Sequence, residues 1–197
     1  MRLRFLQSAM AQESWPVTGL PEIALFGRSN AGKSSLINAL ARERVARVAR
    51  EPGRTRTLNF YAGDGLVLVD LPGYGYAHVS KEQEHRQTEL LRRYTERRTA
   101  LGGAIQLVDI RHTPSELDIA WHEVLRSRGQ PLLLLLGKAD KVGRGRWASR
   151  EQEIVHELGC ESPVVFWSAP SGEGRVAVEA FLHRAAQRQG VPLDSFT

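Results

Sequence analysis

A glycine-rich segment near the start of the chain, residues 27–34 (GRSNAGKS), follows a short apolar run and opens an amphipathic stretch. Glycines at its first and sixth positions let the backbone turn tightly around a polyphosphate, with N–H groups and a helix N-terminus directed at the negative charge. The lysine can reach the β- and γ-phosphates, and the serine hydroxyl after it can ligate Mg²⁺. The strand–loop–helix order predicts a bound nucleoside triphosphate, held by Gly27, Arg28, Ser29, Asn30, Ala31, Gly32, Lys33 and Ser34.

Apolar runs alternate with segments of helical periodicity along the chain, which predicts a mainly parallel sheet with helices on both faces. Strands are expected over residues 22–26, 57–61, 66–69, 104–108, 132–136 and 164–167. Helices are expected over residues 33–40, 81–99, 115–128, 150–158 and 176–187. Together with the phosphate loop, this pattern predicts the three-layer α/β fold of P-loop nucleotide hydrolases, with six to seven strands.

The predicted helix over 115–128 has a recognisable start. Thr113 offers a capping hydroxyl, Pro114 suits the first helical position, and Glu116 is placed to cap in return. Residues 42–56, in contrast, show no clear period, and we expect a mobile loop there between the first helix and the second strand.

Length and charge limit the class of protein. A chain of 197 residues fits one domain, which we divide into an N-terminal extension packed on the domain (1–20), a nucleotide-binding domain (21–190) and a tail (191–197). A net charge of +5 and a pI near 9.8 favour a polyanionic partner, with a solvated basic face as the alternative. Since the chain has one cysteine, no apolar run of bilayer length and no signal peptide, we expect a cytoplasmic monomer without a membrane partner.

The apolar run at residues 66–69 ends in Asp70-Leu71-Pro72-Gly73. A carboxylate at this strand end would hold Mg²⁺ through water, and the N–H of Gly73 would meet the γ-phosphate. The alternative is a plain Asp-Pro-Gly turn that ends a strand.

Residues at the ends of two further strands predict which nucleotide base is bound. Gly137-Lys138-Ala139-Asp140 stands where GTP-binding domains carry Asn or Thr followed by Lys-x-Asp. The Asp140 carboxylate would accept hydrogen bonds from guanine N1–H and the exocyclic amine, whereas adenine offers an acceptor at N1. The stem of Lys138 would lie along the base, and the missing side chain at Gly137 would affect affinity more than base identity. A surface turn is the alternative. At the next strand end, a backbone N–H within Trp167-Ser168-Ala169 would meet guanine O6.

The order of these elements is that of a translation-factor-type GTPase, which needs a second hydroxyl ligand for Mg²⁺ when GTP is bound. The irregular loop offers Gly53-Arg54-Thr55-Arg56-Thr57. Thr55 is the preferred ligand, because Thr57 reads as the first residue of a strand. Arg54 and Arg56 flank this threonine, either as an arginine finger in cis or as contacts to RNA phosphates.

Several longer strings resemble the EngB (YihA/YsxC) family of TrmE-Era-EngA-EngB-Septin-like P-loop GTPases. These strings are PEIA from Pro21, GRSNAGKSSLINAL from Gly27, PGRTRTLNFY from Pro52, VDLPGYGYA from Val69 and VDIRHTPSELD from Val108. The resemblance implies a bacterial assembly factor that binds GTP and GDP, acts on the large ribosomal subunit precursor, and is needed for normal cell division and septation. It also implies that Thr55 is the switch threonine, that Mg²⁺ sits on Ser34 and Thr55, and that Gly137 replaces the family's usual Thr.

Tyr74 follows the Asp70–Gly73 element, at the place where Ras-like enzymes have a water-orienting glutamine. A phenol cannot orient water in the same way, so we expect slow hydrolysis of GTP to GDP and phosphate. Asn30 resembles the P-loop asparagine that holds K⁺ in potassium-stimulated GTPases, where the cation neutralises charge between the phosphates. An asparagine that only braces the loop is the alternative. The expected catalytic residues are Lys33, Thr55, Gly73 and Asn30.

Two rival functions stay open at this point. A P-loop kinase of a small metabolite would keep the phosphate loop but has no use for Asp140 or Ser168-Ala169. A non-hydrolysing nucleotide-dependent scaffold is compatible with Gly137 and Tyr74. The predicted helix over 81–99 is rich in arginine and is either an rRNA or ribosomal-protein contact or an exposed solvated face; these arginines are Arg86, Arg92, Arg93, Arg97 and Arg98.

Overall fold

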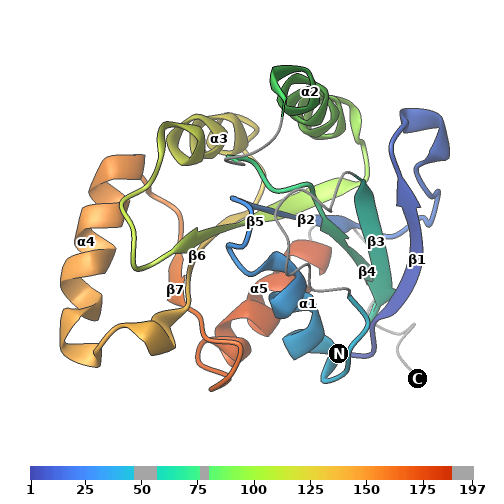
Figure 1. The fold of residues 1–197 in the computed structure, drawn as a ribbon. Helices are drawn as coiled ribbons and strands as arrows, with labels where there is room; N and C mark the ends of the chain where they lie inside the picture. Colours follow the sequence, from blue (N-terminus) through green and yellow to red (C-terminus); the bar gives the residue numbers. More distant parts are fainter. Residues whose placement is uncertain (47–56, 76–79, 188–197) are drawn as a thin grey trace.

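The computed structural model describes residues 1–46, 57–75 and 80–187. These residues form a seven-stranded sheet in the order β1-β3-β4-β2-β5-β6-β7. Helices lie on both of its faces (Figure 1), which confirms the predicted three-layer α/β fold. The strands are β1 (Arg4–Ala9), β2 (Glu22–Gly27), β3 (Leu58–Gly63), β4 (Leu66–Asp70), β5 (Leu101–Asp109), β6 (Leu132–Gly137) and β7 (Val164–Phe166).

The central strands run parallel. β2 pairs with β4 and β5, β5 pairs with β6, and β6 pairs with β7, all in parallel. At one edge, β3 runs antiparallel to β4 and β1 antiparallel to β3. Because parallel strands end on the same side, the segments that follow β2, β4, β5, β6 and β7 meet at one edge of the sheet.

Two layers of helices cover the sheet (Figure 1). On one face, α1 and α5 bury Leu36, Leu40 and Phe181 against the strands. On the other, α2 and α3 bury Tyr94 and Trp121, and α4 packs over β6. In the described part of the chain, no helix has the length and apolarity needed to cross a membrane. The helices are α1 (Lys33–Ala41), α2 (Lys81–Arg97), α3 (Glu116–Ser127), α4 (Trp147–Leu158) and α5 (Arg175–Gln187), with short 3₁₀ turns η1 (Gln12–Ser14), η2 (Ala139–Lys141) and η3 (Arg144–Arg146).

Every predicted strand and helix is present, with ends that shift by a few residues. The structure adds β1, which the sequence pattern did not predict. This edge strand has little alternation between buried and exposed side chains, and Phe5 is 50% exposed. Its hydrogen bonds to β3 therefore come from tertiary pairing rather than from a local hydrophobic pattern.

The predicted cap of α3 is wrong by two residues. Ser115 is the N-cap: its hydroxyl accepts from the N–H of Asp118 at 3.3 Å, and the Asp118 carboxylate accepts from the N–H of Ser115 at 2.8 Å. Thr113 instead donates its hydroxyl to Glu153 of α4 at 3.1 Å. Glu116 does not return the cap, because Asp118 holds the position three residues after the true N-cap.

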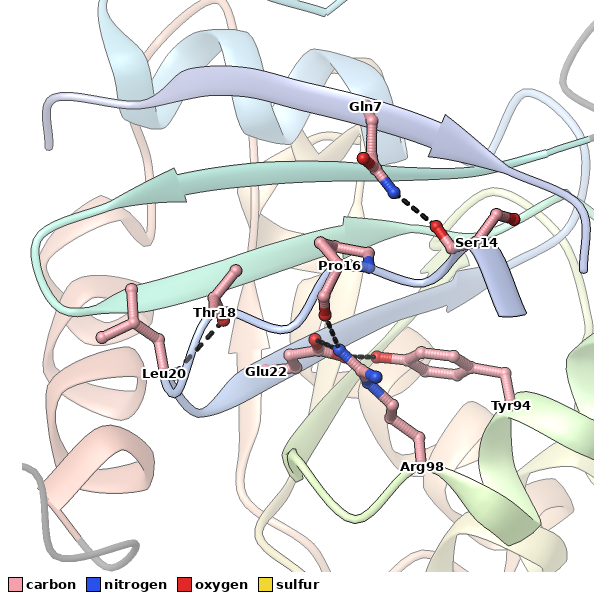
Figure 2. Close-up of polar contacts among 8 residues, drawn as sticks. All are labelled: Gln7, Ser14, Pro16, Thr18, Leu20, Glu22, Tyr94 and Arg98. Atoms are coloured by element: carbon pink, nitrogen blue, oxygen red, sulfur yellow. Dashed lines mark hydrogen bonds and ion pairs between the residues drawn. The ribbon is translucent and has the colours of Figure 1, made fainter. Parts of the chain in front are cut away.

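A buried ion pair fixes the start of β2, the strand that leads into the phosphate loop (Figure 2). Glu22 is fully buried and accepts hydrogen bonds from the Arg98 guanidinium and, at 2.7 Å, from the Tyr94 hydroxyl. Arg98 also donates to the carbonyl of Pro16 and lies over the ring of Trp15. One cluster thus joins the N-terminal segment, the end of α2 and the start of β2.

Replacing Arg98 by Met should lower the free energy of unfolding by about 3–5 kcal/mol, because Glu22 would stay buried without its cation. Urea unfolding of the full chain measures this change. Arg97→Met, one residue earlier on an exposed position, is the matched control and should shift stability by no more than about 0.5 kcal/mol. Equal stability of the two variants would show that the cluster contributes nothing.

Candidate nucleotide-binding site

The phosphate loop between β2 and α1 has an unusual backbone. Gly27 has φ +151°, and a Cβ there would lie 2.7 Å from the carbonyl oxygen of Leu107 in β5. Asn30 and Gly32 have φ values of +63° and +112°. Gly32 is the N-cap of α1 and offers no side-chain cap, so the first N–H groups of the helix are available to an anion.

Lys33 is buried at the base of this loop. Its ammonium donates to the carbonyl oxygens of Gly27 at 2.9 Å and Arg28 at 3.3 Å. Burial lowers the pKa of Lys33, while the charges of Asp70 and Asp118 act in the opposite direction. A bound polyphosphate would supply further negative charge beside this ammonium and stabilise its protonated form.

Ser34 and Asp70 form the predicted metal side of the site. The hydroxyl of Ser34 donates to Asp70 Oδ2 at 2.8 Å, and the buried Oδ1 of Asp70 has no partner. Burial raises the pKa of Asp70, against the lowering effects of Lys33 and Ser34. A hydroxyl beside an unsatisfied carboxylate oxygen fits Mg²⁺, which binds oxygen and keeps several waters. No three His, Cys, Asp or Glu side chains gather into a metal cluster among the described residues.

The threonine loop falls largely outside the described residues, which exclude the predicted Gly53, Arg54, Thr55 and Arg56. Thr57 is described, and its hydroxyl donates to Asn59 Oδ1 at 3.1 Å. β3 begins one residue later, at Leu58. The predicted strand start at Thr57 is therefore one residue too early, and the choice of Thr55 as second hydroxyl ligand stays a prediction.

Asp140 and Ser168 meet at the ends of β6 and β7, on the predicted base side. The Ser168 hydroxyl donates to Asp140 Oδ1 at 2.8 Å, and the N–H of Ala139 donates to the carbonyl of Trp167 at 3.0 Å. The hydrogen bond from Ser168 lowers the pKa of Asp140. A carboxylate that stays ionised and is held in one orientation is the acceptor that guanine N1–H and its amine require.

Sequence patterns indicated no role for Asp109, which the structure places beside Lys138. Asp109 Oδ2 lies 2.9 Å from the Lys138 ammonium, and Arg111 donates to both carboxylate oxygens. Burial opposes ionisation of Asp109, but hydrogen bonds from Arg111 and Lys138 hold its pKa well below the usual range. Lys138 itself has a left-handed backbone with φ +60°, and Asp109 holds its ammonium. The position of Asp109 at the end of β5, next to β6, is the feature that could have indicated a role in the site.

Gly73 and Tyr74 close over the phosphate loop. A Cβ on Gly73 would lie 2.7 Å from the backbone nitrogen of Ser29. The N–H of Ser29 donates to the carbonyl of Tyr74 at 2.9 Å. The tyrosine side chain is buried, and its hydroxyl donates to Asp118 at 2.9 Å. Sequence reasoning expected only that Tyr74 does not orient water and did not foresee this anchoring.

The structure thus gathers the described candidates at one edge of the sheet. Nucleotide contact by each of them stays a prediction; they are residues 27–34, Asp70, Leu71, Pro72, Gly73, Gly137, Lys138, Ala139, Asp140, Trp167, Ser168 and Ala169.

Comparison with known proteins decides the family. The model of a family described as 50S ribosome-binding GTPase matches residues 22–138. The chain is 44% identical over 180 residues to a probable GTP-binding protein EngB of Lactiplantibacillus plantarum, covering 89% of this chain and 91% of the relative. The chain belongs to the EngB family of GTP-binding proteins. A probable EngB of Heliobacterium modesticaldum is 46% identical over 175 residues, covering 87% of this chain and 85% of the relative.

Solved structures agree on the fold. A crystal structure of a probable GTP-binding protein EngB superposes with a TM-score of 0.71 and 20% identity, covering 85% of this chain and 99% of that one. Era in complex with MgGDPNP and nucleotides 1506–1542 of 16S ribosomal RNA superposes with a TM-score of 0.69 and 20% identity, covering 84% of this chain and 56% of Era. Identities this low support the P-loop GTPase fold and nothing finer.

Within the EngB frame, Gly137 has a defined neighbour. A Cβ at this position would lie 3.3 Å from the carbonyl oxygen of Ala31 in the phosphate loop. The Ala31 carbonyl is thus the acceptor nearest to a hydroxyl-bearing side chain at this position, and glycine leaves this contact unmade. A hydroxyl-bearing side chain at position 137 is therefore expected to raise the affinity for nucleotide.

We expect Gly137→Thr to tighten GDP binding about fivefold, the effect of one added hydrogen bond. Gly137→Ala is the matched control, because it adds the Cβ without a donor and should bring no gain. Titration with fluorescent GDP measures both variants. Weaker binding by both would mean that the loop cannot accommodate a Cβ, and the expected brace would be excluded.

Proposed function

We propose that this EngB-family protein hydrolyses GTP slowly and acts as a nucleotide switch in assembly of the large ribosomal subunit, with a linked requirement for normal cell division and septation. In this proposal it works in the cytoplasm as a monomer. Its ligands are GTP and GDP with Mg²⁺, and its partner is the subunit precursor with its rRNA and ribosomal proteins.

The observation that carries the proposal is the placement of two carboxylates around one phosphate loop. Asp70 lies at the end of β4 in contact with Ser34, and Asp140 lies at the end of β6 in contact with Ser168. One suits a hydrated cation and the other suits the donor edge of guanine. A P-loop kinase has no use for the Asp140–Ser168 pair, so this geometry supports a guanine nucleotide switch.

The chemistry requires few protein groups. A water molecule attacks the γ-phosphate in line with the leaving GDP, and no covalent intermediate is needed. The Lys33 ammonium and the N–H of Gly73 stabilise charge on the phosphate oxygens. Mg²⁺, held by Ser34 with Asp70 behind a water and with Thr55 as the proposed second ligand, would neutralise charge between the β- and γ-phosphates. Tyr74 offers its carbonyl and a buried phenol, neither of which replaces a water-orienting glutamine, so intrinsic turnover is slow.

A polyanionic partner agrees with the net charge of +5 and with the description of the matching family model as ribosome-binding. Four of the five arginines named for α2 and its C-terminal end have acidic partners. Arg86, Arg92 and Arg93 are paired with glutamates four residues away, and Arg98 is bound to buried Glu22. The α2 face therefore fits the solvated alternative better than an rRNA contact.

Sedimentation with purified large subunits and their precursors tests the proposal. The protein should co-sediment most strongly with precursor particles in a non-hydrolysable GTP analogue, and less in GDP or without nucleotide. Association through charge alone would be lost at higher salt in every nucleotide state. Equal co-sedimentation in all three states would contradict a nucleotide switch.

Single-turnover phosphate release, with and without large subunits, separates a slow GTPase from a non-hydrolysing scaffold. Release should be slow alone and faster with subunits.

Asn30 lies exposed in the phosphate loop, where its carboxamide is proposed to hold K⁺, so phosphate release should be faster in KCl than in NaCl at equal ionic strength. Equal rates in the two salts would exclude K⁺, and no release under any condition would favour the scaffold.

A further inference from the structure

A buried polar cluster lies behind the phosphate loop, between β5 and α3. Its members are almost inaccessible to solvent: Asp118 is 2% exposed, His122 1% and Gln106 0%. Tyr74, from the segment after Gly73, completes the cluster and is 5% exposed. Buried polar groups are retained at a cost unless their hydrogen bonds are made, so such a cluster holds its members in fixed positions.

Asp118 is the centre of this cluster. Its Oδ1 accepts from the Tyr74 hydroxyl at 2.9 Å. Its Oδ2 accepts from the N–H and hydroxyl of Ser115 at 2.8 and 2.6 Å. The backbone carbonyl of Asp118 accepts from Gln106 Nε2 at 2.8 Å, and Gln106 Oε1 lies 2.7 Å from His122 Nδ1. Both carboxylate oxygens and the main chain are therefore bound, and Asp118 cannot move without breaking the start of α3.

The main chain of Tyr74 makes a second contact, to the phosphate loop. Its carbonyl accepts from the N–H of Ser29 at 2.9 Å, and Arg28 and Tyr74 form an isolated parallel bridge. Gly73, directly before it, approaches the backbone of Ser29 so closely that a Cβ would lie 2.7 Å from its nitrogen. One residue thus connects Asp118 to the part of the loop that Gly73 covers.

This connection bears on where a third phosphate would lie. Gly73 is the residue whose N–H is proposed to meet a γ-phosphate, so its close contact with Ser29 marks the end of the loop where a third phosphate would lie. A diphosphate does not reach that end, and the contact between Ser29 and Tyr74 can persist beside it. On this placement a triphosphate would take the Ser29 N–H as a donor, and the Tyr74 carbonyl, which accepts from that N–H at 2.9 Å, would be displaced.

We propose that Asp118 is a positioning residue which, through the Tyr74 hydroxyl, holds the Gly73–Tyr74 segment against the phosphate loop and so biases the protein toward GDP and against GTP. The inference rests on the proposed nucleotide switch and names the side-chain contact that sets its resting state. The free energy of the Asp118–Tyr74 hydrogen bond then opposes GTP binding and is absent from GDP binding.

A purely structural role for Tyr74 is the competing explanation. Its ring stacks on Trp121, with centroids 6.4 Å apart and an interplanar angle of 25°, and belongs to the apolar core under α2 and α3. Tyr74→Phe separates the two roles, because it keeps the ring and removes only the hydroxyl.

The test is a pair of titrations on the full chain in Mg²⁺, one with GDP and one with a non-hydrolysable GTP analogue. Tyr74→Phe should leave the affinity for GDP unchanged and raise the affinity for the GTP analogue about fivefold, the effect of one lost hydrogen bond. Asp118→Asn is the second variant; its neutral amide oxygen accepts more weakly from the Tyr74 hydroxyl, so it should shift the same ratio in the same direction by a smaller factor. Combined with Tyr74→Phe it should add nothing further, because the hydroxyl whose contact it weakens is then absent.

Ser115→Ala is the matched control, because it removes a different hydrogen bond from the same carboxylate and leaves Tyr74 untouched. It should lower thermal stability through the lost helix cap and leave the nucleotide ratio as in the unaltered protein. An unchanged ratio in Tyr74→Phe, or an equal effect on both nucleotides, would overturn the inference. Failure of the unaltered chain to bind either nucleotide would instead overturn the proposed function, so the two failures are distinguishable.

Discussion

The close packing of the phosphate loop against its neighbouring strand ends is the constraint on which the rest of the structure depends. Each of three close backbone contacts in this region involves a glycine. A Cβ on Gly27 would lie 2.7 Å from Leu107 of β5, one on Gly73 would lie 2.7 Å from Ser29, and one on Gly137 would lie 3.3 Å from Ala31. The loop is thus shaped by the ends of three strands, and anything that moves one of those ends changes the space available to a phosphate.

The charges of the site follow from this packing. Lys33 and Asp70 are both buried. Burial lowers the pKa of Lys33 and raises the pKa of Asp70, so it favours the neutral form of each side chain. Each needs an opposite charge to stay ionised, and a magnesium polyphosphate supplies both signs at once. The distant end of the site is built differently: Asp140 is accessible to solvent, and the hydrogen bond from Ser168 lowers its pKa. The end proposed for the phosphates is therefore desolvated, whereas the end proposed for the base is open to water.

Much of this arrangement could be predicted from the sequence, because it depends on local patterns. Apolar runs followed by glycine, aspartate or serine predicted the strand ends, and parallel topology brought them to one edge. The rest depends on tertiary partners. β1 is held by pairing with β3, the cap of α3 is Ser115 with Asp118 rather than Thr113 with Glu116, and the burial of Glu22 or Gln106 leaves no mark on the local pattern. Polar residues that become buried cannot be told from surface residues until their partners are known.

The most direct measurement is a calorimetric titration of the unaltered protein with GDP, inosine diphosphate and ADP under the same Mg²⁺ concentration. If Asp140 accepts from both guanine donors, GDP should bind tighter than inosine diphosphate, which lacks the exocyclic amine. ADP should then bind at least about a hundredfold more weakly than GDP, since it faces the carboxylate with an acceptor. Equal affinity for ADP and GDP would contradict the account, because the loop would then hold any nucleoside diphosphate and Asp140 would not discriminate between guanine and adenine.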